Sequence, residues 1–229
     1  MTSPIIAEAV RCAVPPGVEV RRMSDAEWAE FVARRDAERP EDVERRRRIA
    51  LRRAHVEHVG APEFGDADRR ALARATSGAG LYVFGPCGVG KTRWAKGIVR
   101  AAVEAGDDAL FESFAGLMDK ALSRDDEDPD APRRYRERVR SVRVLAIDDV
   151  GHGNPTNARL DELRSLLGDR LDAGLPTVVT SNYALPDLGA ALSAGGNGNA
   201  ARAVVDRLSA LEQIELRGRS HRQDWRRAS

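Results

Sequence analysis

The sequence has few cysteines and no long apolar run. Its two cysteines, Cys12 and Cys87, give no disulfide framework and suit a reducing cytosol. No stretch approaches the roughly 18 apolar residues of a membrane helix, and the segment 4–6 is too short for the apolar region of a signal peptide. We therefore expect a cytoplasmic protein with no membrane partner.

The chain also has no large excess of positive or negative charge. Charged residues make up 32% of the 229 residues, yet the formal net charge is only +1. No global field therefore marks the chain as a nucleic-acid binder, and any contact with DNA must come from local clusters. No internal repeat is visible, and a hydrophobic content of 42% is enough for the core of one ordinary domain with an appendage.

Lysine is scarce, because it supplies only three of the 37 cationic residues. One of the three completes the pattern G-x-x-x-x-G-K-T, which consists of Gly85, Pro86, Cys87, Gly88, Val89, Gly90, Lys91 and Thr92. An apolar strand is predicted before it, over 81–84, and a helix after it, over 93–104. This is the context of a phosphate-binding loop.

The residue types of this loop suit phosphates. The glycines let successive N–H groups turn inward, and the next helix begins with its positive end towards the phosphates. Lys91 would reach the β- and γ-phosphates of ATP, and the Thr92 hydroxyl would hold Mg²⁺. A compact ammonium fits this niche better than a planar guanidinium, so a lysine kept in an arginine-rich chain supports the hypothesis. The alternative is a glycine turn with no ligand, and Cys87 is a small filler or a redox-sensing thiol.

A second apolar run, 144–147, predicts a buried strand that ends at Asp148 and Asp149. A strand that delivers carboxylates beside a phosphate loop completes the Mg²⁺ site of phosphoryl-transfer folds. We expect Asp148 to bind the ion through water and Asp149, on the other side of the strand end, to orient the attacking water. Ordinary turn acids at a strand end are the alternative.

The remaining pattern alternates strands with helices. Further strands are predicted over 109–112, 176–182 and 213–216, and helices over 113–122, 135–143, 156–173 and 201–211. Five strands in this order predict an α/β fold with a parallel sheet that binds its ligand at the carboxyl ends of the strands. The segment 193–200 is rich in Gly and Asn and predicts a mobile loop.

The region before the sheet is predicted to be helical. A capping box from Ser24 to Glu27 opens a first helix, and further helices are predicted over 41–58 and 66–74. A boundary near residue 76 would separate a small helical N-terminal region, 1–76, from an ATP-binding domain, 77–229.

Arginines cluster in two places. The clusters are Arg45, Arg46, Arg47, Arg48, Arg52 and Arg53 in the second helix, and Arg217, Arg219, Arg222, Arg226 and Arg227 at the end of the chain. A solvated helix face is one interpretation of the first cluster. A contact with DNA phosphates or with an acidic partner is the other.

Taken in series, the motifs resemble those of one family, the AAA+ ATPases of the DnaC/DnaI helicase-loader and IstB transposase-accessory type. Residues 85–92 resemble its Walker A, 144–151 its Walker B with paired Asp, and 176–182 its sensor 1. Residues 205–208 and 214–222 resemble its C-terminal signature, which ends in Ser-x-Arg. The resemblance covers about 77–222 and implies a P-loop AAA+ core that binds ATP and Mg²⁺.

The resemblance also implies roles for single residues. Asn182 would be the sensor, and Arg207 would be an arginine finger supplied to the ATP of a neighbouring subunit, with Arg170 as a second candidate for that interface. Arg222 matches the terminal Ser-x-Arg and would contact the nucleotide. Two departures from the wider AAA+ pattern are shared with the loader type. Too few residues follow the fifth strand for a C-terminal helical lid, and Asp149 stands where many relatives have Glu, so hydrolysis is expected to be slow.

Four functions are compatible with these residues. The first is a replicative-helicase loader in DNA replication that assembles into a homo-oligomer on ATP, contacts single-stranded DNA and holds the helicase through residues 1–76, by analogy alone. The second is an IstB-like partner of a transposase, which the motifs do not separate from the first. The third is a small-molecule kinase on a P-loop scaffold, and the fourth is a nucleotide-binding scaffold without turnover.

Overall fold

The computed structural model describes residues 24, 26–27, 40–59, 80–124, 127–153, 155–194, 196–218 and 220. The chain divides into two compact units, Met1–Arg45 and Arg46–Ser229. Several predictions lie outside the described residues. They are the helix over 66–74, the boundary near 76, the role of Arg222 and the absence of a lid after the fifth strand. Most residues of the predicted first helix also lie outside.

The predicted capping box is present in the first unit. The Ser24 amide donates to Glu27 Oε2 at 2.7 Å, and the Glu27 amide donates to Ser24 Oγ at 3.2 Å. These reciprocal bonds satisfy two amides that have no partner within the helix at its start.

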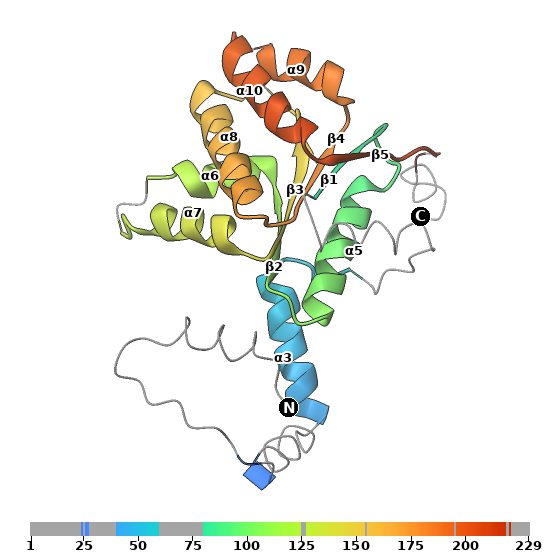
Figure 1. Ribbon diagram of the computed structural model, residues 1–229, viewed down its shortest axis with the longest axis vertical. Coiled ribbons are helices and arrows are strands. Elements are labelled where there is room, and N and C mark those ends of the chain that lie inside the picture. Colours follow the sequence, from blue (N-terminus) through green and yellow to red (C-terminus); the bar gives the residue numbers. More distant parts are fainter. Residues whose placement is uncertain are drawn as a thin grey trace. The chain divides into compact units, whose positions relative to one another are not determined.

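A five-stranded parallel sheet forms the centre of the second unit, with the strand order β2-β3-β4-β1-β5 (Figure 1). The strands are β1 Leu81–Phe84, β2 Ala109–Ser113, β3 Val144–Val150, β4 Thr177–Ser181 and β5 Glu212–Glu215. The predicted α/β fold with a five-stranded parallel sheet is therefore confirmed. Strand β1 lies between β4 and β5. The phosphate-binding pattern, which follows β1, and the end of β4 are therefore neighbours at the carboxyl ends of the strands.

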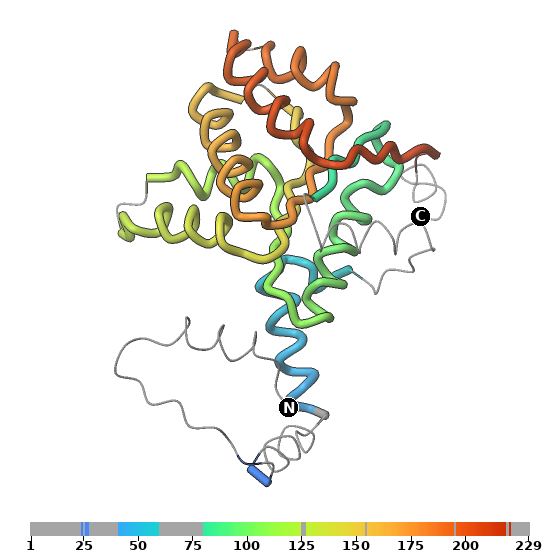
Figure 2. The backbone as a smooth tube through the Cα atoms, viewed as in Figure 1, coloured from blue at the N-terminus to red at the C-terminus, as the bar shows by residue number. Residues whose placement is uncertain are grey.

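Helices cover both faces of this sheet, with α5 on one face and α6 and α8 on the other (Figures 1 and 2). The helices of the described residues are α3 Pro40–Arg53, α5 Lys91–Glu104, α6 Phe114–Leu122, α7 Ala131–Ser141, α8 Asn157–Asp172, α9 Leu185–Ser193 and α10 Gly198–Ser209. Side chains alternate along β1, as a strand requires. Leu81 and Val83 pack with Ile98 of α5, whereas Tyr82 packs with Leu163 of α8 and the other helices of the second face.

The end of α3 protects the outer edge of β2. The helix was predicted to reach residue 58, but it ends at Arg53 because His55 has a φ of 60° and turns the chain. Leu51 and Ala54 are buried in the core beside α5. The Phe111 amide of β2 donates to Ala54 O at 3.1 Å, so this edge strand finds a partner outside the sheet.

Two further differences lie after β4. Helix α9 was not predicted, although Leu185, Leu188 and Leu192 are buried at helical spacing. Helix α10 begins at Gly198, inside the stretch that composition alone predicted to be a loop. Asn197 anchors this stretch, because its side chain is buried and donates to Pro155 O at 2.5 Å.

Candidate functional site

The phosphate-binding pattern forms the loop between β1 and α5. Gly88 and Gly90 have φ values of 89° and 99°, in the left-handed region where a side chain is strained. Gly90 is also the N-cap of α5, so the amide-rich first turn of that helix faces the loop. The predicted strand, glycine loop and helix are thus present in series, with α5 beginning at Lys91 rather than at residue 93.

Lys91 lies over this loop with only 8% of its surface exposed. Its ammonium group donates to Gly85 O, to Pro86 O and to Asn182 Oδ1, each at 2.8 Å. Asn182 follows β4, the neighbour of β1, which explains why two residues so distant in sequence meet. The two side chains predicted to be the phosphate lysine and the sensor are therefore in direct contact.

The two predicted metal ligands also meet. Thr92 Oγ1 donates to Asp148 Oδ2 at 2.9 Å, and Asp148 is 8% exposed. Thr180 of β4 donates to Asp148 Oδ1 at 2.5 Å and so fixes the orientation of the carboxylate. A hydroxyl and a carboxylate at this separation are hard oxygen ligands, which is the donor type that Mg²⁺ takes together with phosphate and water.

A β-bulge in β3 positions the second carboxylate. The strand was predicted to end at Asp148 and Asp149, but it continues to Val150, and its register against β4 shifts between Ile147 and Val150. Asp149 sits in this bulge with a φ of 63°, a conformation that Asp tolerates better than most residues. Its amide donates to Thr180 Oγ1 at 3.0 Å, and Asn182 Nδ2 donates to Asp149 Oδ1 at 3.2 Å.

These residues form a continuous chain of hydrogen bonds at the carboxyl ends of the strands. It runs through Lys91, Asn182, Asp149, Thr180, Asp148 and Thr92. Side chains from β3 and β4 and from the start of α5 therefore converge where the parallel strands end, which is the place for a ligand in such folds.

Comparison with known proteins agrees with this geometry. The sequence matches the family of IstB-like ATP binding proteins over residues 35–229. The chain belongs to this family. The resemblance inferred from the Walker and sensor motifs is therefore confirmed.

Relatives of the IstB-like protein are found in sequence and in structure. A protein of Mycobacterium tuberculosis, named as an ATP-binding protein in an insertion sequence, is 32% identical over 117 residues, which cover 51% of this chain and 46% of that protein. The chain thus matches about half the length of this curated relative.

Solved structures share the fold. DnaI has a TM-score of 0.57 at 23% identity, covering 68% of this chain and 88% of that one. The DnaC helicase loader has a TM-score of 0.53 at 21% identity, covering 66% and 86%. AMPPCP-bound DnaA from Aquifex aeolicus has a TM-score of 0.55 at 16% identity, covering 69% and 47%. The predicted P-loop AAA+ core is therefore confirmed as the fold of this IstB-like protein.

Sequence analysis missed two residues that support the site. Thr180 bonds both acidic residues of β3, and the polar end of β4, Thr-Ser-Asn, was the available signal. Tyr82 lies in β1, where its hydroxyl donates to Tyr183 O at 2.7 Å and so holds the segment after Asn182. Burial raises the pKa of Tyr82 to about 12, and a hydrogen bond with Ser181 opposes this. Tyr82 therefore stays protonated as a donor near neutral pH.

Arg207 of the IstB-like protein lies apart from this cluster. It is on the last turn of α10, its side chain is 44% exposed, and it pairs with Asp206 at 2.9 Å. Strand β5 follows, and Glu212 at its start is paired with Leu81 at the start of β1. Arg207 therefore lies near the amino ends of the strands, whereas the phosphate loop lies at their carboxyl ends. These two ends are separated by the length of a strand, roughly 13 Å.

Arg170, the second finger candidate, is fully buried at 0% exposure. Its Nε donates to Thr177 Oγ1 at 2.9 Å, and its terminal nitrogens donate to the carbonyls of Val139 (3.0 Å), Val142 (2.8 Å) and Pro176 (2.7 Å). Burial lowers the pKa of Arg170 to about 10, so it remains charged at neutral pH. The prediction of an interface role is wrong, because this guanidinium ties the C-terminal end of α7 to the start of β4.

Replacing Arg170 should therefore affect stability. Arg170→Met is expected to lower the free energy of unfolding by about 3–5 kcal/mol, because buried carbonyls lose their donors. Arg164→Met is the matched control on the same helix, where the side chain is 44% exposed, and its effect should stay within about 0.5 kcal/mol. Urea denaturation of both variants measures the difference. Equal stability of the two variants would contradict the structural role.

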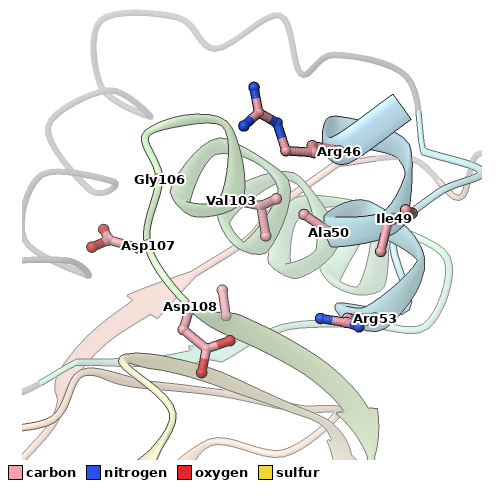
Figure 3. A pocket seen from close by; sticks show the side chains of 9 residues that line it. Arg46, Ile49, Ala50, Arg53, Val103, Gly106, Asp107 and Asp108 are labelled. Carbon is pink, nitrogen blue, oxygen red and sulfur yellow. The ribbon is translucent and has the colours of Figure 1, made fainter. Parts of the chain in front are cut away.

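A pocket of about 370 Å³ lies at the amino end of β2, away from the phosphate loop (Figure 3). Arg46 and Arg53 come from α3, and Asp107 and Asp108 come from the turn between α5 and β2. Because this turn precedes β2, the pocket is separate from the phosphate loop.

Within the described part of the chain, no helix has the length and apolar character that a membrane span requires.

Proposed function

We propose that this IstB-like protein hydrolyses ATP and uses the nucleotide to control its own assembly on DNA together with a protein partner. The hydrogen-bonded chain from Lys91 to Thr92 through Asn182, Asp149 and Asp148 carries the proposal. It joins a cationic phosphate ligand, a sensor amide and two carboxylates at the end of a glycine loop. These are the parts that phosphoryl transfer to water needs.

Each residue has a distinct role in this proposal. Lys91 and the loop amides bind the β- and γ-phosphates. Thr92 and Asp148 would hold Mg²⁺, which would neutralise charge on the phosphate oxygens. Asp149 accepts a hydrogen bond from the attacking water and orients it. Asn182 contacts both Lys91 and Asp149. A phosphate that draws Lys91 away from Asn182 therefore also changes the surroundings of Asp149.

For the partner we favour a transposase. The family, and a relative named after an insertion sequence, support this choice. The likeness to DnaI and DnaC, below 25% identity, concerns the fold alone. Loading of a replicative helicase, single-stranded DNA contact and a homo-oligomer formed on ATP stay predictions. Single-stranded DNA binding should require ATP and weaken with salt, since contacts to phosphates release counterions.

Lys91→Ala tests the proposal at its first step. We expect this variant to lose most of its affinity for ATP and to keep its fold, because Lys91 contacts loop carbonyls and Asn182 rather than the apolar core. Lys96→Ala is the matched control, since Lys96 lies on the same helix and contacts the Phe111 ring instead, at 4.7 Å. Calorimetric titration with Mg-ATP, and circular dichroism for the fold, give the comparison.

Two results would contradict the proposal. One is equal ATP affinity of the Lys91 and Lys96 variants, which would remove the phosphate-loop assignment. The other is an absence of phosphate release by the wild-type protein with DNA and partner present, which would leave a scaffold without turnover. Release of phosphate with no acceptor molecule present would argue against a small-molecule kinase.

A further inference from the structure

Two residues after β5, Leu216 and Ser220, lie against the phosphate loop. The Leu216 amide donates to Phe84 O at 2.8 Å, which extends the pairing with β1 one residue beyond the end of β5. The Leu216 carbonyl then approaches Gly85 so closely that a Cβ there would lie 2.2 Å from the oxygen. Only a glycine permits this approach, so Leu216 and the start of the loop are fitted to each other.

A second contact lies at the centre of the loop. A Cβ on Gly88 would lie 2.1 Å from Ser220 Oγ and 2.9 Å from Ser220 Cβ. The Ser220 side chain therefore occupies the space beside the Gly88 backbone. Within the described part of the chain the Ser220 hydroxyl makes no hydrogen bond, and the residue is half-buried. A donor without a partner thus lies against the middle of a loop built to bind an anion.

We propose that Ser220 belongs to the nucleotide site and that its hydroxyl donates a hydrogen bond to a phosphate bound in the loop. This inference rests on the proposed ATP binding. Gly88 is flanked by amides that would face the phosphates, and Ser220 reaches the same residue from the C-terminal segment. A hydrogen bond to a charged oxygen is stronger than one between neutral groups. The short side chain also suits the site, because a larger one would press on the loop.

Ser220→Ala tests this, since it removes the hydroxyl and almost no volume. We expect its affinity for Mg-ATP and Mg-ADP to fall about tenfold, the effect of losing one hydrogen bond to a charged group. The thermal unfolding midpoint of the nucleotide-free protein should stay unchanged. Ser141→Ala is the control, because Ser141 is exposed at the end of α7 and bonds only a carbonyl of its own helix, Arg138 O. Titration calorimetry with the full chain measures all affinities.

The outcomes separate this inference from the proposed function. If the wild type binds ATP and Ser220→Ala binds it within twofold, Ser220 is not a phosphate ligand, while the proposed function stands. If Ser220→Ala loses both affinity and nucleotide-free stability, the residue supports the loop without contacting phosphate, and the inference is overturned. If the wild type binds no ATP, the proposed function is wrong and this inference is wrong with it.

Discussion

Asp149→Asn is expected to lower ATP turnover by roughly 10²- to 10⁴-fold, while Mg-ATP still binds. The amide cannot accept a proton from water, and it aligns water less well than a carboxylate. The substitution should not disturb the fold, because Asn adopts the left-handed conformation of Asp149, with its φ of 63°, at least as readily as Asp. Steady-state phosphate release and calorimetric binding separate the two effects.

Two companion variants make this result specific. Asp148→Asn should weaken Mg²⁺-dependent binding itself, because Asp148 is the carboxylate bonded to Thr92. Asp172→Asn, on the exposed end of α8, should leave both binding and turnover unchanged. Full turnover in Asp149→Asn would show that another group orients the water.

Arg207→Ala is expected to bind ATP as the wild type does and to lose turnover by ~10³-fold or more, the contribution typical of an arginine finger. Arg207 is exposed near the amino edge of the sheet, while its own phosphate loop follows the carboxyl edge. It is therefore poorly placed for its own ATP. An effect on hydrolysis must then act on the ATP of an adjoining subunit. Arg202→Ala, on the same helix and also exposed, is the matched control.

Mixing two inactive variants tests this action between subunits directly. Lys91→Ala keeps Arg207 but has lost most of its affinity for ATP, and Arg207→Ala binds ATP but lacks the finger. At an interface between them, one site is complete, so ATPase activity should return and reach a maximum at an intermediate ratio. If both proteins are folded and associate, yet no ratio restores activity, Arg207 does not act on a neighbour's ATP.

The elements around the phosphate loop could be predicted because their signals are local. Apolar runs gave β1 and β4 within a residue of their observed bounds, and the glycine pattern gave the loop between β1 and α5. Parallel strands place their carboxyl ends together, so the approach of Asn182 to Lys91 also follows from topology.

Other features depend on contacts between distant residues. The bulge at Asp149 arises from the pairing of β3 with β4, and no pattern within 144–150 indicates it. Arg170 is one of many arginines, and composition alone assigns such a residue to the surface. Only the meeting of α7, α8 and the start of β4 creates the buried carbonyls that it satisfies. Helix α9 was a missed local signal, because its leucines at 185, 188 and 192 have helical spacing.

The two edge strands of the sheet, β2 and β5, are both poorly suited to pair with a strand of another copy. In β2 the Phe111 amide is already bonded to Ala54 O. At the other edge, β5 presents the exposed acids Glu212 and Glu215, the second paired with Arg217 at 2.5 Å. A second copy that added its own strand there would have to desolvate these charges, which is a common defence against edge-to-edge aggregation. If copies assemble on ATP as predicted, they are therefore expected to meet through helices and loops rather than by adding strands to the sheet.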